Sequence, residues 1–101
     1  MIQKYKVVVF TQSKLDLHEI VNYWKKTLQI SPKPFLDDYE AALINISEFP
    51  FSHHQPQDEH LKAKGYRICP VRNYYIFYII EGDTVQIHRI LYNKMDFTRL
   101  F

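Results

Sequence analysis

Apolar and polar residues follow one another along the chain in patterns that predict six elements. Residues 2–10 alternate at first and then turn apolar, which predicts a strand running from an exposed to a buried position. Apolar side chains recur at spacings of three and four over 14–28 and 35–49, which predicts two helices. Ser13 is expected to cap the first helix, with Asp16 three residues later in a capping-box pattern. The prolines of 31–34 and Pro50 are expected to end the two helices.

The second half of the chain predicts three strands. Residues 51–64 are polar and without period, and we expect a loop with at most a partial turn of helix. Strands are predicted at 65–71, 73–80 and 84–92, and the middle one should be central because it is apolar on both faces. A turn at 81–83 joins the last two strands. The tail, residues 93–101, offers three apolar side chains for docking: Phe97, Leu100 and Phe101.

The predicted order is strand-helix-helix-strand-strand-strand. This order indicates an α+β fold in which a helical hairpin packs on one face of a small, mostly antiparallel four-stranded sheet. The other face of the sheet should be partly open, or covered by a partner. At 101 residues the chain is long enough for one modest core, so we expect a single domain over residues 1–101.

Composition narrows the protein class only a little. Of the residues, 47% are hydrophobic and 24% are charged, which is typical of a globular protein. Cys69 is the only cysteine, so it forms no intramolecular disulfide, and it is most simply a small buried hydrophobe. No apolar run approaches the roughly 20 residues that cross a bilayer, and residues 1–6 hold no apolar stretch of signal-peptide length. We therefore expect a cytoplasmic protein without a membrane partner.

Positive charge gathers toward the end of the chain. Residues 1–60 hold six lysines and arginines against eight acidic residues, a net −2, whereas 61–101 hold seven against three, a net +4. This imbalance predicts a basic surface that binds a nucleic acid or a protein target through four residues: Arg67, Arg72, Arg89 and Lys94. In the alternative reading, Arg67 and Arg72 flank a hairpin and pair with Asp83 or Glu81, and Arg89 pairs across strands.

Histidines cluster in the polar loop, at His53, His54 and His60, beside Asp58 and Glu59. Their spacing lacks the fixed geometry of a His-x-x-x-His helix pair or of paired cysteines. We predict a solvated loop there and no metal site.

Five short segments, in this order, resemble the RelE/ParE superfamily of type II toxin–antitoxin toxins over nearly the whole chain. They are Asp-Leu-x-x-Ile-x-x-Tyr at 16–23, Ile-x-x-Phe-Pro at 46–50, Gly-Tyr-Arg at 65–67, Asn-Tyr-x-x-Phe-Tyr at 73–78 and Arg-Ile-Leu-Tyr-x-x-x-Asp at 89–96. The resemblance implies a bacterial or plasmid-stabilisation toxin without cofactor, neutralised by a cognate antitoxin. It leaves a homodimer or a heterotetramer with the antitoxin open.

Two activities occur in this superfamily, and the resemblance implies that this chain has one or the other. RelE-like members cleave mRNA in the ribosome, which here would use Arg67, Arg72 and Lys94 for charge, with Tyr92, His88 or a loop histidine as proton carrier. ParE-like members poison DNA gyrase without catalytic residues. An arginine of the nucleases falls on Tyr75, and the tail has phenylalanines where they carry a tyrosine. We therefore favour the ParE-like activity, with the RelE-like one as the alternative.

Two further expectations follow from the resemblance. A nuclease needs Arg67, Lys94 and a proton carrier to converge on the open face of the sheet. An antitoxin segment should cover the apolar surface around the helical hairpin and the sheet. Its candidate anchors, chosen by residue type, are Tyr23, Trp24, Tyr39 and Phe101. The alternative is that these side chains complete the core of the protein itself, above all Trp24.

Overall fold

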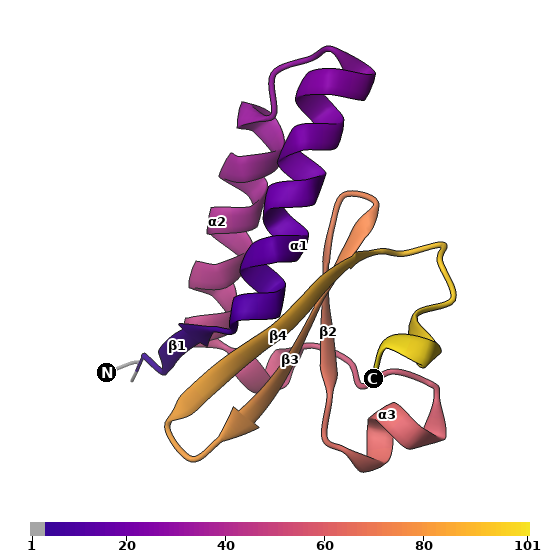
Figure 1. Cartoon of the computed structure of the whole chain (residues 1–101). Helices are drawn as coiled ribbons and strands as arrows, with labels where there is room; N and C mark the ends of the chain where they lie inside the picture. Colours follow the sequence, from indigo (N-terminus) through magenta and orange to yellow (C-terminus); the bar gives the residue numbers. More distant parts are fainter. Residues whose placement is uncertain (1–3) are drawn as a thin grey trace.

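The computed structural model describes residues 4–101, so the predicted strand residues 2 and 3 lie outside the described part. The order of the main elements agrees with the prediction (Figure 1). They are β1 (Lys6–Val9), α1 (Thr11–Asn22), η1 (Tyr23–Leu28), α2 (Lys33–Glu48), η2 (Pro50–Ser52), α3 (Glu59–Ala63), β2 (Arg67–Val71), β3 (Tyr74–Glu81), β4 (Thr84–Tyr92) and η3 (Phe97–Leu100). The three predicted C-terminal strands are confirmed to within two residues at each end. The partial helix expected in the polar loop is α3.

The four strands form one mixed sheet with the order β1-β4-β3-β2. β1 runs parallel to β4, and the other two neighbouring pairs are antiparallel. β3 is central, as its two apolar faces predict. The helices pack on this sheet, so the predicted α+β fold class is confirmed.

The start of α1 corrects the capping prediction. The helix begins at Thr11, directly after β1, and Phe10 occupies the cap position. The Phe10 amide donates to the Ile87 carbonyl of β4, and the Phe10 carbonyl accepts from Lys14. Ser13 is fully buried inside the first turn, and no side chain caps the helix. The pairing of β1 with β4 therefore decides where the helix begins, and the predicted Ser13 cap is wrong.

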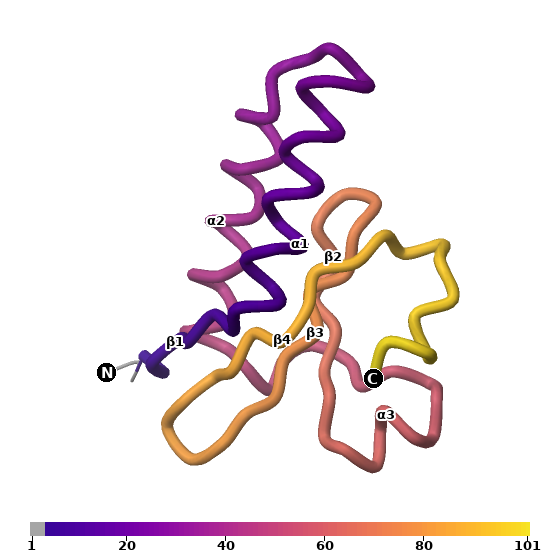
Figure 2. Tube along the Cα trace, in the orientation of Figure 1, coloured from indigo at the N-terminus to yellow at the C-terminus, as the bar shows by residue number. Residues whose placement is uncertain are grey.

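The C-terminal part of the first helix is a π-helix and not the α-helix that the sequence predicted. Residues Tyr23–Leu28 form a π-helix, which ends at Gln29 in the left-handed conformation (φ 56°). π-helical turns are rare and often occur at functional sites. Figures 1 and 2 show this end of the helix beside α2, where the chain turns back toward the sheet.

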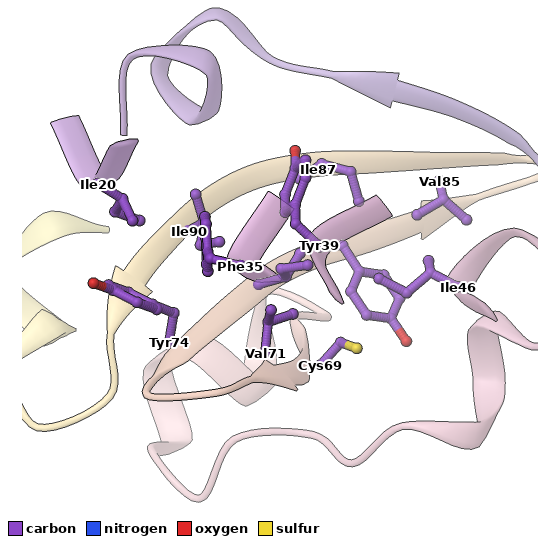
Figure 3. Close-up of a cluster of buried hydrophobic side chains, with 12 residues drawn as sticks. Ile20, Phe35, Tyr39, Ile46, Cys69, Val71, Tyr74, Val85, Ile87 and Ile90 are labelled. Atoms are coloured by element: carbon purple, nitrogen blue, oxygen red, sulfur yellow. The ribbon is translucent and has the colours of Figure 1, made fainter. Parts of the chain in front are cut away.

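The main core lies between the helices and one face of the sheet (Figure 3). Phe35 and Ile46 of α2 are fully buried against strand residues of β3 and β4. Cys69 is buried here too, as predicted for a small hydrophobe. Tyr78 donates a buried hydrogen bond of 2.6 Å to the Pro50 carbonyl, which fixes the segment after α2.

The opposite face of the sheet is covered by the chain itself, which corrects the expectation of an open face. A second apolar cluster lies there, built on Leu61 of α3, Tyr66, Phe77 and Leu91. Phe97 and Phe101 of the tail pack on it, with ring centroids 4.9 Å from that of Phe77. Leu100 does not dock with them and stays 41% exposed.

Candidate functional site

A groove of about 1040 Å³ lies between the first helix and the end of β4. α1 and η1 form one wall, and the last residues of β4 with the tail form the other. Several large apolar side chains on its rim are exposed to solvent, namely Tyr23, Leu28, Tyr92, Met95 and Leu100. An exposed apolar surface of this kind commonly marks a binding site.

The floor of the groove is a buried ion pair between Asp16 of α1 and Arg89 of β4. Arg89 donates two hydrogen bonds to the carboxylate, at 2.8 and 3.0 Å, and the Ile90 amide donates a third at 3.2 Å. Asp16 is only 6% exposed. Two of the five segments that carry the family resemblance, 16–23 and 89–96, therefore meet at this pair. Arg89 pairs with a helix, not across strands as the alternative reading had it.

Arg72 lies in the turn between β2 and β3 and lines the groove. It lies in the left-handed conformation (φ 53°), and its Nε donates to Asp38 at 2.7 Å. Its guanidinium lies 5.7 Å from the centre of the Trp24 ring, and Trp24 donates to the Tyr74 hydroxyl at 3.4 Å. The pairing of Arg72 with Asp83 or Glu81, which the alternative reading of the sequence gave, is wrong. Arg72 instead ties the turn to the two helices.

Arg67 lies on a different part of the molecule. It shares the helix-covered face of β2 with Cys69, because alternate strand residues point the same way. Its guanidinium donates to the carbonyls of Phe51 (3.4 Å) and His53 (2.7 Å) and lies over the Phe51 ring. The pairing of Arg67 with Asp83 or Glu81 in the alternative reading is wrong as well.

Arg67 and Lys94 do not converge. Arg67 is opposite Tyr78, whereas Tyr92, two residues before Lys94, is opposite Tyr74 at the other end of the sheet. Four residues along the strands and two strand spacings put Arg67 and Tyr92 about 15 Å apart. Lys94 is exposed in the turn after β4.

The best candidate proton carrier is a pair of residues on the far face, Tyr66 and His88. A β-bulge leaves His88 without an opposite residue on β3. Its Nε2 donates to Gln86 Oε1 at 3.1 Å, so its Nδ1 accepts from the Tyr66 hydroxyl at 2.8 Å. Burial lowers the pKa of His88 and raises that of Tyr66, so burial favours the uncharged form of both side chains. Sequence reasoning named His88 but missed Tyr66, because a bulge cannot be read from residue alternation.

Of the four residues predicted to anchor the antitoxin, two lie in the groove. Tyr23, 48% exposed, and the half-buried Trp24 line the groove together with Arg72, Arg89 and Tyr92.

Tyr39 is 8% exposed in the main core, so it offers no surface to a partner. Phe101 packs against Tyr66 on the opposite face of the sheet, with ring centroids 4.8 Å apart. Sequence reasoning missed Leu28, Met95 and Leu100 as groove residues, because nothing in their local pattern distinguishes them.

The polar loop offers no metal ligands in a suitable arrangement. His53 is bonded to Asn45 at 2.9 Å, and burial lowers its pKa. Over residues 4–101 no three histidine, cysteine or acidic side chains come together as a metal site would require. In the same range no helix combines the length and apolarity that a membrane crossing needs.

Comparison with solved structures places this fold among toxins of toxin–antitoxin systems. The toxin–antitoxin complex RelBE2 of Mycobacterium tuberculosis is 23% identical, with a TM-score of 0.64 over 88% of this chain and 98% of that one. A chromosomal ParDE system of P. aeruginosa is 16% identical, with a TM-score of 0.68 over 89% and 97%. The E. coli DinJ–YafQ complex is 18% identical, with a TM-score of 0.56 over 97% and 98%.

The sequence itself assigns the family. Residues 8–97 match the model of the ParE toxin of the type II toxin–antitoxin system parDE, and the chain belongs to this family. No curated protein sequence matches the chain. The predicted membership of the RelE/ParE superfamily is thus confirmed.

Proposed function

We propose that this toxin acts by binding DNA gyrase and needs no catalytic residue of its own. The observation that carries the proposal is the separation of Arg67 from the end of β4, where Tyr92 lies about 15 Å from it along and across the strands, two residues before Lys94. RNA cleavage would need cations and a proton carrier gathered around one phosphate. The face where they would meet is filled by apolar side chains, with Phe97 and Phe101 on top.

Messenger RNA cleavage in the ribosome is the second candidate function. One observation favours it: the hydrogen-bonded pair Tyr66–His88 lies beside a second hollow of about 650 Å³. Arg89 also lines this hollow, but its guanidinium is already committed to Asp16. Among the described residues that line this hollow, Arg89 is the only lysine or arginine, so the proton carrier Tyr66–His88 has no uncommitted cation beside it there. This is why we rank cleavage second.

The partner that we propose is a cognate antitoxin. The similar proteins of M. tuberculosis and E. coli were solved as toxin–antitoxin complexes. In this chain the groove offers exposed apolar side chains at its rim and a neutralised ion pair at its floor. Tyr23 and Trp24 are the proposed anchors, since large aromatic side chains dominate many interfaces.

Pulse labelling separates the two candidate functions. The chain is expressed from an inducible promoter in a bacterium without the antitoxin, and thymidine and amino-acid incorporation are followed in one culture. We expect thymidine incorporation to fall first, and His88→Gln to fall on the same time course, because gyrase binding needs no proton carrier. An early collapse of amino-acid incorporation that His88→Gln abolishes would instead establish cleavage.

A further inference from the structure

The segment after α2, residues 49–54, lies along β2, and we call it the strap. Its carbonyls accept hydrogen bonds from the sheet: Tyr78 donates to Pro50 at 2.6 Å, Arg67 to Phe51 and His53 at 3.4 and 2.7 Å, and the Ile68 amide to His54 at 2.9 Å. The Arg67 guanidinium also lies 5.3 Å from the centre of the Phe51 ring. Arg67 therefore clamps the strap to β2.

The strap covers the outer edge of the sheet. β2 is an edge strand, and its Ile68 amide points away from β3 toward the strap. Directions alternate along a strand, so Pro70 points outward as well, but it has no amide hydrogen. Without the strap, the Ile68 amide would stand unpaired at an open edge to which another strand can add.

One contact of the strap involves a side chain that titrates near neutral pH. The Nε2 of His53 bonds to the Oδ1 of Asn45 on α2 at 2.9 Å, and the ring donates because an amide oxygen only accepts. Burial lowers the pKa of His53, and His54 and Arg67 lower it further. The closed strap therefore favours the neutral imidazole.

The surroundings of His53 offer nothing that balances a positive charge. α2 faces the ring with the neutral Asn45, and β3 faces it with the ring of Tyr78, 6.2 Å away. The charged or titratable groups that act on it are His54 of the strap and Arg67 of β2. No ion pair of residues 4–101 includes His53.

We propose that protonation of His53 releases the strap, which makes it a pH-sensitive cover of the β2 edge. An imidazolium at His53 repels the Arg67 guanidinium, and opening of the strap separates the two charges. The stabilisation is complete above the ordinary pKa of histidine, about 6.5, and is lost as the pH falls below it. The proposal is independent of the proposed function, because no strap residue lines the groove or the second hollow.

Hydrogen exchange of the Ile68 amide measures how often the strap opens. Each rate is divided by the rate of an unstructured chain at the same pH. An open state with an ordinary histidine predicts that this ratio rises by up to about tenfold from about pH 7.5 to about pH 5.5. The Cys69 amide points toward β3 and is the internal reference, whose ratio should change much less.

Three variants of matched size assign the effect to His53. His53→Gln keeps a donor for Asn45 but does not titrate, so the rise at Ile68 should disappear. Asn45→Asp places a carboxylate against the ring, so the imidazolium gains a partner and the strap should stay closed at the lower pH. His60→Gln changes an exposed histidine of α3 and should leave the rise as it is in the wild type.

A ratio for Ile68 that rises no more than that for Cys69 overturns the proposal. So does a rise that persists in His53→Gln, or one that is lost in His60→Gln. If His53→Gln does not fold, Asn45→Asp decides, because a rise as large as that of the wild type contradicts the role of His53. None of these results bears on gyrase binding.

Discussion

Replacing Asp16 by alanine should lower the free energy of unfolding by about 3–5 kcal/mol, because it leaves the Arg89 guanidinium buried without its partner. The loss also frees the Ile90 amide, which donates to the same carboxylate. Small domains are stable by only about 5–15 kcal/mol, so we expect a largely destabilised protein. Urea unfolding followed by circular dichroism measures the change.

Two further variants test whether the loss of stability comes from leaving a buried charge without its partner. Asp38→Ala breaks the exposed pair with Arg72 and should cost less than about 1 kcal/mol. The double variant Asp16→Leu, Arg89→Met removes both buried charges and should be more stable than Asp16→Ala. Equal destabilisation by Asp16→Ala and Asp38→Ala would contradict our account, in which the buried ion pair holds α1 against β4.

Replacing Phe35 by alanine should cost about 3–5 kcal/mol, because it opens a cavity in the main core. Phe35 is fully buried, and its ring centroid lies 5.8 Å from that of Trp24 and 5.2 Å from that of Tyr74. Both neighbours line the groove, so the cavity also removes the support of the groove wall. We expect weaker antitoxin binding in addition to the lower stability, measured by unfolding and by calorimetry.

Ile44 on the same helix supplies the control for Phe35. It is 51% exposed, and Ile44→Ala should change the free energy of unfolding by no more than about 0.5 kcal/mol. A Phe35→Ala variant as stable as Ile44→Ala would show that the helix does not pack on the sheet as described.

The strands and helices were predictable because their signal is local. β3 is buried on both faces, and its run of apolar residues shows this directly. The capping prediction failed because the pairing of β1 with β4 starts the helix at Thr11, before Ser13, and because the carboxylate of Asp16 pairs with Arg89, 73 positions along the chain. Residues 13–16 match a local cap pattern, but the Asp16 carboxylate accepts hydrogen bonds from Arg89 and from the Ile90 amide of β4.

The site was only partly predictable, for a similar reason. Residue type and the family segments identified Tyr23, Trp24 and Arg89, which do meet in the groove. The residue types of Arg67 and Tyr39 gave no information on which face they occupy. The bulge at His88 changes the alternation within β4, and so the contact between Tyr66 and His88 appears only once the register of the sheet is known.

A cleavage assay with purified gyrase tests the central claim most directly. The chain is added to negatively supercoiled DNA and to gyrase from the bacterium that carries the gene, and the reaction is stopped with detergent and protease. Our account predicts that linear DNA accumulates as the concentration of the chain rises. Unchanged DNA, together with cut mRNA when the same preparation is added to translating ribosomes, would contradict it.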